Sequence, residues 1–281
     1  MSGRHSQERE TLPMTLRTSI AMIAASAALA GPALAAEPLV TGLAVYDIAL
    51  GAGKDGGIGG ISGTMSAKLE RNCDAYETEA SLDADISGPD GSTMPLSVIS
   101  SHRETADSLD FDIATSLADM VVDAASGEAT RGSGGVSVAI EAPMKETVTL
   151  AGDVLFPVAM LEAAIAAAKA GESFREFRTF DGTGKGQEVW TVSVLITPAG
   201  KAAEEDEALF AAGLGFGDLE RWRMSLSYFP PGAGGEQTPA FSTSMVVYEN
   251  GFAQAAVYDL GPFAMRLTLT EFQPIPPKPC P

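Results

Sequence analysis

Apolar and polar residues alternate with a period of two along most of the chain after residue 40. Such alternation predicts antiparallel strands with one buried face, because successive side chains of a strand point to opposite faces of the sheet. In the first half the alternating segments are residues 43–50, 61–69, 73–82, 95–104, 108–116, 120–128, 135–141 and 145–151. In the second half they are residues 175–180, 187–197, 223–229, 240–248, 252–260 and 263–272.

The alternation is interrupted by one helical pattern, at about residues 157–170. Pro157 stands at its start and Gly171 just past its end, as expected for the two ends of a helix. One helical face carries the apolar residues Met160, Leu161, Ala164, Ile165 and Ala168. The sequence therefore predicts one main helix between two β-rich halves.

Glycine-rich and polar turns separate the predicted strands. Residues 51–60 predict a hairpin turn, and Asn250-Gly251 is a strong signal for another. The acidic run 202–209 predicts a helical turn or a loop, and residues 274–281 form a proline-rich tail. Because no linker of disordered composition divides the halves, we predict a single, mostly β domain over residues 37–281, built on a large, strongly curved antiparallel sheet or open barrel.

The first 36 residues have the composition of a signal peptide. Arg17 supplies a positive charge, residues 20–29 form an apolar stretch too short to span a bilayer, and 33–35 (ALA) form a small-x-small cleavage site. Met14 is a better start than Met1, because the residues before it only lengthen the charged region. A buried N-terminal helix is the alternative. We expect cleavage near Ala35 and export of a soluble protein to the bacterial periplasm.

The charge of the chain excludes several classes of partner. The formal net charge is −19, from 37 acidic and 18 basic residues, and removal of residues 1–36 makes it −20 because three arginines and two glutamates leave. Such a surface does not bind nucleic acid or an anionic membrane surface. With two Cys and two His in the whole chain, we expect no metal centre and no cofactor.

Cys73 and Cys280 are the only cysteines of the chain. In an oxidising compartment two cysteines most simply form one disulfide, and two separate thiols are the alternative. The pair is not a C-x-x-C motif, so we expect a stabilising role and no redox catalysis.

Candidate catalytic and phosphate-binding residues are few. His102 is the only histidine after residue 36, and no G-x-S-x-G motif accompanies it, so a solvated or structurally bonded histidine is favoured over a Ser–His–Asp triad. Gly53-Lys54 and Gly184-Lys185 resemble fragments of a phosphate loop, but neither lysine is followed by Ser or Thr.

Carboxylates and apolar residues leave two further alternatives open. The candidate carboxylates are Asp83, Asp85, Asp107, Asp110, Asp112 and residues 204–207 (EEDE). Asp110 and Asp112 would share a strand face, yet a glycosidase needs two carboxylates facing across a cleft, and a solvated acidic face is favoured. A curved sheet with eleven methionines could hold an apolar groove, although a filled core beneath the helix is the simpler interpretation.

Several segments, in order, resemble a known family. They are 45–50 (VYDIAL), 61–65 (ISGTM), 73–77 (CDAYE), 163–171 before Phe174, 180–182 (FDG), 225–229 (SLSYF), 238–241 (TPAF), 248–251 (YENG) and Cys280. Together they resemble the EipB-type cell-envelope integrity proteins over about residues 40–280. Thr41-Gly42 stands where that family often has His-Arg, so no role of that pair is carried over.

The resemblance implies a periplasmic protein of alphaproteobacteria that is needed for envelope integrity. It also implies a β-spiral, a long curved antiparallel sheet wrapped around a helix, similar to the lipoprotein carriers of the Lol type. It further implies a disulfide between Cys73 and Cys280. It brings no catalytic residues.

We therefore expect a non-enzymatic periplasmic protein that supports envelope integrity by binding a protein, lipid or lipoprotein partner. We expect a monomer that does not span the membrane, and we assign no catalytic residue, cofactor or metal ligand. A carrier of a lipid or lipoprotein acyl chain is the second hypothesis. A hydrolase of envelope glycans, for which no motif is present, is the third.

Overall fold

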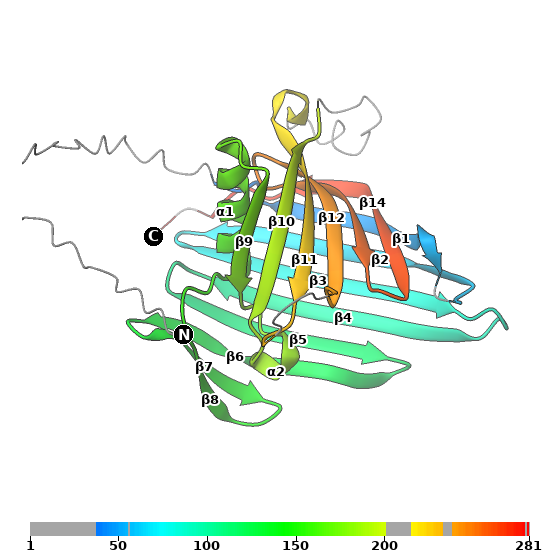
Figure 1. The fold of residues 1–281 in the computed structure, drawn as a ribbon, viewed down its shortest axis with the longest axis horizontal. Helices are drawn as coiled ribbons and strands as arrows, with labels where there is room; N and C mark the ends of the chain where they lie inside the picture. The colour runs from blue at the N-terminus through cyan, green and yellow to red at the C-terminus, as the bar shows by residue number, and fades with distance from the viewer. Residues whose placement is uncertain (1–37, 56, 201–214, 233–237, 279, 281) are drawn as a thin grey trace, which may run out of the picture. The chain divides into compact units, whose positions relative to one another are not determined.

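The computed structural model describes residues 38–55, 57–200, 215–232, 238–278 and 280, and the statements below concern these residues. Fourteen strands form one antiparallel sheet in the order β8-β7-β6-β5-β4-β3-β2-β1-β14-β13-β12-β11-β10-β9 (Figure 1). The predicted signal peptide at residues 1–36 and the acidic run 202–209 lie outside the described residues.

The strands divide into two runs separated by the main helix. The first eight are β1 (Gly42–Asp55), β2 (Gly60–Asn72), β3 (Ala75–Ser87), β4 (Thr93–Glu104), β5 (Ser108–Leu117), β6 (Met120–Gly132), β7 (Gly135–Ala142) and β8 (Glu146–Leu150). After α1 (Pro157–Lys169) come β9 (Phe174–Thr179), the short α2 (Thr183–Gly186), β10 (Trp190–Pro198), the single turn η1 (Phe216–Asp218), β11 (Arg221–Phe229), β12 (Phe241–Tyr248), β13 (Ala253–Asp259) and β14 (Phe263–Pro274).

The alternation in the sequence corresponds to the two faces of this sheet. In β5, for example, Leu109, Phe111 and Ile113 are buried while Asp110 and Asp112 are exposed. The prediction of a mostly β fold, with an open antiparallel sheet and one main helix, is confirmed.

The two runs of strands join through the ends of the domain. β1 pairs with both β2 and β14, so the first and last strands lie together in the middle of the sheet. The sheet edges are then β8 and β9, which are neighbours in the chain on either side of α1. The β9 edge is covered by Leu155, whose backbone N–H donates to the Arg178 carbonyl and whose carbonyl accepts from the Phe180 N–H.

Contacts between distant strands require the sheet to curve. α1 packs on β9 and β10, at one end of the sheet, while its first turn binds Glu104 of β4. Eight strands lie between β4 and β9 in the sheet order. Phe111 of β5 likewise meets Phe180, which follows β9, edge to face at 5.5 Å between ring centroids. The sheet therefore bends so that its two ends approach across the inner face.

Three clusters of buried apolar side chains fill parts of this inner face. The first lies under α1 and includes Ile165, Val194 and Met224. The second is an aromatic cluster around Phe216 and Phe252. The third packs the β5–β7 strands against the segments on either side of α1.

Two local predictions are wrong. Residues 51–60 were expected to be a turn, but β1 continues to Asp55, where its register with β14 shifts relative to Leu50, and the reversal comes only before Gly60. The strand continues past the glycine-rich residues because β14 pairs with it again at Asp55, opposite Phe263. Cys73 was expected to begin a strand, but it occupies the two-residue turn between β2 and β3, with a φ of 58°.

Glu104 supplies the N-terminal cap of α1 from a different element. Its carboxylate oxygens accept hydrogen bonds from the backbone N–H groups of Val158 and Ala159, both at 2.8 Å. The residue before the helix, Phe156, offers no side-chain cap of its own. A negative charge at a helix N-terminus is favourable, and these donors would otherwise lack partners in the interior.

Burial nevertheless makes ionisation of Glu104 costly. Glu104 is only 4% exposed, and burial raises the pKa of its carboxyl group from 4.5 to about 7. The two amide hydrogen bonds and Arg131 favour the charged form, while the nearby Glu162 disfavours it. Desolvation outweighs the bonds, so the cap titrates near neutral pH.

The Glu104 cap predicts a specific pH dependence of stability. Because the folded pKa is raised, its contribution to stability is fully present below pH 4.5 and is lost as the pH rises through 7. Thermal unfolding at pH 5 and pH 8 should show a larger loss of stability for the native chain than for Glu104→Gln, by roughly 3 kcal/mol at most. Glu128→Gln, at an exposed carboxylate of β6, is the control and should keep the native slope. Equal slopes in all three proteins would contradict the prediction.

Candidate functional site

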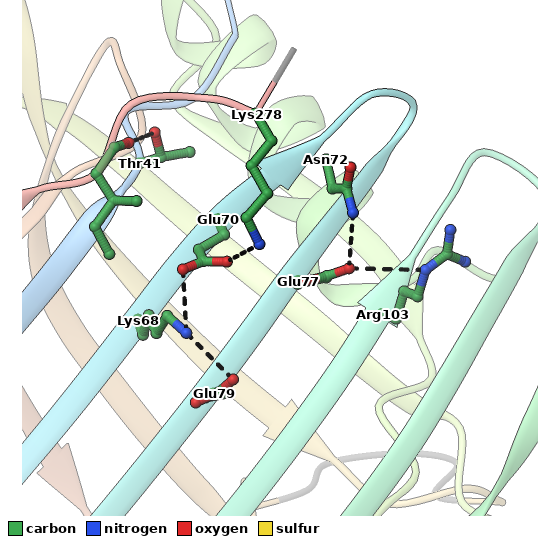
Figure 2. Close-up of polar contacts among 9 residues, drawn as sticks. Thr41, Lys68, Glu70, Asn72, Glu77, Glu79, Arg103 and Lys278 are labelled. Atoms are coloured by element: carbon green, nitrogen blue, oxygen red, sulfur yellow. Dashed lines mark hydrogen bonds and ion pairs between the residues drawn. The ribbon is translucent and has the colours of Figure 1, made fainter. Parts of the chain in front are cut away.

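The tail after β14 is fastened to the edge of the β1–β2 pair (Figure 2). The Ile275 N–H donates to the Thr41 carbonyl at 3.0 Å, and the Thr41 hydroxyl donates to the Ile275 carbonyl at 2.5 Å. Further on, the Lys278 N–H donates to the Arg71 carbonyl at 3.1 Å, and Lys278 forms a parallel bridge with Asn72. The tail thus crosses the start of β1 and reaches the end of β2.

Ion pairs hold the same tail from the side. The Lys278 Nζ lies 2.9 Å from Glu70 Oε2, and the Lys68 Nζ lies 3.1 Å from Glu70 Oε1 and 3.4 Å from Glu79 Oε1. Hydrogen bonds from the two lysines lower the pKa of the Glu70 carboxyl. In Figure 2 these four side chains form a chain of alternating charges from the tail across β2 to β3.

These contacts bring together Cys73 and Cys280, the two cysteines expected to pair. Cys73 is half-buried in the β2–β3 turn, Cys280 is exposed in the tail, and both are free thiols in this structure. The neighbouring Cys280 thiol raises the pKa of the Cys73 thiol. The C-terminal clasp, as we name residues 275–280 with the β2–β3 turn, therefore joins positions about 200 residues apart in the sequence.

His102 lies on the inner face with both ring nitrogens engaged. Nε2 is 2.9 Å from the Asp181 carbonyl, and Nδ1 is 3.3 Å from the Thr78 hydroxyl. Since a carbonyl can only accept, Nε2 carries the proton and Nδ1 accepts from Thr78. Burial lowers the pKa of His102. The ring thereby connects β4 to the turn that follows β9, and no serine is among these hydrogen-bond partners.

Of the carboxylates that the sequence singles out, Asp83, Asp85, Asp110 and Asp112 lie on the outer face of the sheet. Asp110 and Asp112 do share that face, as predicted. They line a shallow pocket of about 510 Å³ across β3–β7, whose wall also includes Glu77, Glu128 and Arg103. Arg103 Nε lies 3.9 Å from Glu77 Oε1. Asp83, Asp85 and Asp107 lie outside this pocket, and 204–207 lie outside the described residues.

The two fragments that resemble phosphate loops have different environments. Gly53-Lys54 lies within β1. Gly184-Lys185 lies in α2, where both residues adopt left-handed conformations. At Gly184 the φ of 63° favours glycine, and a Cβ there would require the Glu188 side chain to move. Neither fragment precedes a helix of useful length, which a phosphate loop needs.

Sequence reasoning missed an aromatic group on the inner face of the second half. Trp190, Tyr228 and Phe241 are half-buried, with Tyr228 stacked on Phe241 at 4.2 Å and Trp190 edge-on to both. The Trp190 indole N–H donates to the Thr183 hydroxyl at 2.9 Å. Alternation places Tyr228 on the buried face of β11, but which strands lie opposite depends on the curvature of the sheet.

The described ranges hold neither a helix that could span a membrane nor a group of metal-ligating side chains. No helix there is long and apolar enough to cross a membrane. No three His, Cys, Asp or Glu side chains of those ranges are grouped so as to hold a metal ion.

Comparisons with known proteins agree on one family. A model of the family described as EipB-like matches residues 33–276. The chain is 27% identical over 249 residues to the cell envelope integrity protein EipB of Brucella abortus (strain 2308), covering 85% of this chain and 86% of that protein.

A solved structure shows the same fold. The crystal structure of a beta-barrel-like protein, a domain of unknown function from Brucella abortus, superposes with a TM-score of 0.77 at 22% sequence identity. The superposition covers 85% of this chain and 99% of that one. At this identity the likeness concerns the fold alone.

Proposed function

The chain belongs to the EipB-like family, and on that basis we propose that it is a non-enzymatic periplasmic protein that supports the integrity of the cell envelope by binding a partner. The observation that carries the proposal is the family match over residues 33–276, nearly the whole of the described sheet. The relative from Brucella abortus is named for a role in envelope integrity, and its name specifies no reaction.

The proposal of a binding role is supported by the way the polar residues are used. His102 has both ring nitrogens engaged, and Glu104 caps a helix, so the two buried titratable residues at the end of β4 serve the fold. The protein would therefore act through its surfaces and its inner face. Export is part of the proposal, with residues 1–36 as a cleaved signal peptide and Met14 as the start.

The proposal also includes a disulfide between Cys73 and Cys280. The C-terminal clasp already brings Cys280 next to Cys73, and the proposed compartment is oxidising. The bond would fix the tail against the β2–β3 turn. The tail has three prolines among residues 274–277, so it has few amide donors of its own and would fray if it were untied.

Carriage of a lipid or lipoprotein acyl chain is the second candidate function. The observation that favours it is the half-buried apolar surface on the inner face, which includes Met65, Leu82 and Met245. A filled core would bury such side chains completely, as it does Val194 and Leu109.

We expect deletion of the gene to sensitise cells to detergent and to antibiotics that act on the cell wall, because the family relative is named for envelope integrity. Growth of the deletion strain under these stresses is the measurement. A plasmid copy should restore resistance. A copy that starts at Met14 but lacks residues 15–36 should not, because without the signal peptide the protein stays in the cytoplasm. Normal growth of the deletion strain under several such stresses would refute the envelope role.

We expect the mature protein recovered from the periplasm to begin at Ala36 or Glu37. The physical reason is the order of charge, apolar stretch and small residues that a signal peptidase recognises. N-terminal sequencing or intact mass measures this directly. Ala33→Lys, which places a charged side chain at the cleavage site, should leave the precursor uncut. A periplasmic protein that begins before Thr15 would contradict the prediction.

We expect Cys73→Ser and Cys280→Ser each to lower the melting temperature by roughly 5 °C or more, because the open chain gains conformational freedom when unfolded. The double variant should have the same melting temperature as the single variants. Reductant should lower the melting temperature of the native protein to that value and leave the melting temperatures of the variants unchanged. Thiol titration of the unfolded, unreduced protein should find no free thiol. Two free thiols, or a melting temperature that does not respond to reductant, would show that the bond does not form.

A further inference from the structure

The middle of the inner face is lined by side chains that are only half-buried. On the first run of strands they include Met65, Leu82 and Val98, which lie directly opposite one another on β2, β3 and β4. On the second run they include Met245 and Tyr258. Met65, Leu82, Met245 and Tyr258 all pack against the same buried cluster, so these two walls adjoin inside the fold. Water therefore reaches apolar surface there that a close-packed core would exclude.

Two tyrosine hydroxyls within these walls have no hydrogen-bond partner among the described residues. They belong to Tyr228 and Tyr258, and burial raises the pKa of both phenols. The nearby Tyr46 shows the ordinary situation, because its hydroxyl donates to the Ala253 carbonyl at 2.7 Å. A half-buried hydroxyl without a protein partner pairs with water or with an oxygen of a bound molecule.

The charges around these hydroxyls limit what can bind. Asp181 is the charged group that acts on the Tyr228 phenol, and it disfavours a second negative charge there. Among the described residues, no arginine or lysine makes a cation–π contact with the ring of Tyr228 or Tyr258. A carboxylate or phosphate in this place would be buried without a partner, which is expensive. The polar part of the ligand must therefore be uncharged and must offer an oxygen that accepts hydrogen bonds.

The apolar lining continues outward to the turn between β5 and β6. Leu96, Leu117 and Met120 lie directly opposite one another on β4, β5 and β6, and Met120 is 66% exposed. Met94, two residues before Leu96 on the same face, is also exposed. From β2 to β6 the lining spans about 19 Å, at a strand spacing of about 4.8 Å. A peptide segment lying on it would bury backbone groups that the lining cannot satisfy, whereas a hydrocarbon chain would not.

We propose that this inner face binds the acyl chain of a neutral monoacyl lipid, with the hydroxyls of Tyr228 and Tyr258 donating to its ester or hydroxyl oxygens. The chain runs over Met65, Leu82 and Val98 toward the exposed side chains at the β5–β6 turn. The proposal rests on the proposed binding function and names its ligand class. It also gives the half-buried lining and the two unpaired hydroxyls a single explanation.

The test is titration of the purified mature protein with monolauroylglycerol below its micelle concentration, followed by calorimetry and by the fluorescence of Trp190 beside Tyr228. We expect saturable binding near one lipid per chain. Laurate at pH 8, with the same chain and a charged head, should bind at least tenfold more weakly. Absence of saturable binding, or laurate binding as tightly as the neutral lipid, would overturn the proposal.

Matched variants separate the site from the fold. Tyr258→Phe removes the unpaired hydroxyl and nothing else, so it should fold normally and weaken monolauroylglycerol binding about two- to tenfold, the usual range for one hydrogen bond. Val257→Ala changes the neighbouring residue on the outer face of β13 and should leave binding unchanged. Equal effects of the two substitutions, or no effect of Tyr258→Phe, would overturn the proposal. If binding fails while the deletion strain remains sensitive to detergent, only the ligand class is wrong and the envelope role stands.

Discussion

The pairing of β1 with β14 is the interaction on which the architecture depends. Each run of strands is a simple meander in which consecutive strands pair, and only this contact between the first and last strands makes one sheet of the two. It places the chain's later half against its earlier half at the middle of the sheet, and it sends the tail across β1 toward β2. The meeting of Cys73 and Cys280 is a consequence of that path.

A second constraint comes from α1, which ties two remote parts of the sheet together. Its body packs on the β9–β10 end, and its first turn is held by a carboxylate from β4. A buried carboxylate is an expensive cap, and it is tolerated because it satisfies two helix donors that no local residue reaches. His102, two residues earlier on the same face of β4, makes a hydrogen bond of the opposite sense, because its Nε2–H donates to the Asp181 carbonyl. Both residues link the inner face of β4 to the region around α1 and β9.

Local physics determined most of what could be predicted from the sequence. Period-two alternation located the strands, and Pro157 with Gly171 located the helix, because both signals lie within a few residues of the element they define. The turn at Cys73 was missed because a positive φ at a cysteine leaves no mark in composition. The extension of β1 through a glycine-rich stretch was missed because it depends on a partner strand more than 200 residues away.

The residues of functional interest also divide into those that the sequence could identify and those that only the fold reveals. The sequence named Cys73, Cys280 and His102 because they are rare residue types in this chain. It could not name Glu104, Tyr228 or Tyr258, since glutamate and tyrosine become notable only when a remote element buries them. Their environments are produced by curvature, and curvature is a property of the whole sheet.

The structure of the two sheet edges affects the tendency of the protein to aggregate at high concentration. A closed barrel has no free edge, whereas an open sheet leaves unpaired backbone groups that can recruit another chain. Here Leu155 bridges the end of one edge strand, β9, at Thr179, and the other edge strand, β8, is only 5 residues long. A sheet this large would otherwise be a template for fibrous aggregation. A short β8 and a bridge at the end of β9 both reduce the length of free edge that a second chain could pair with.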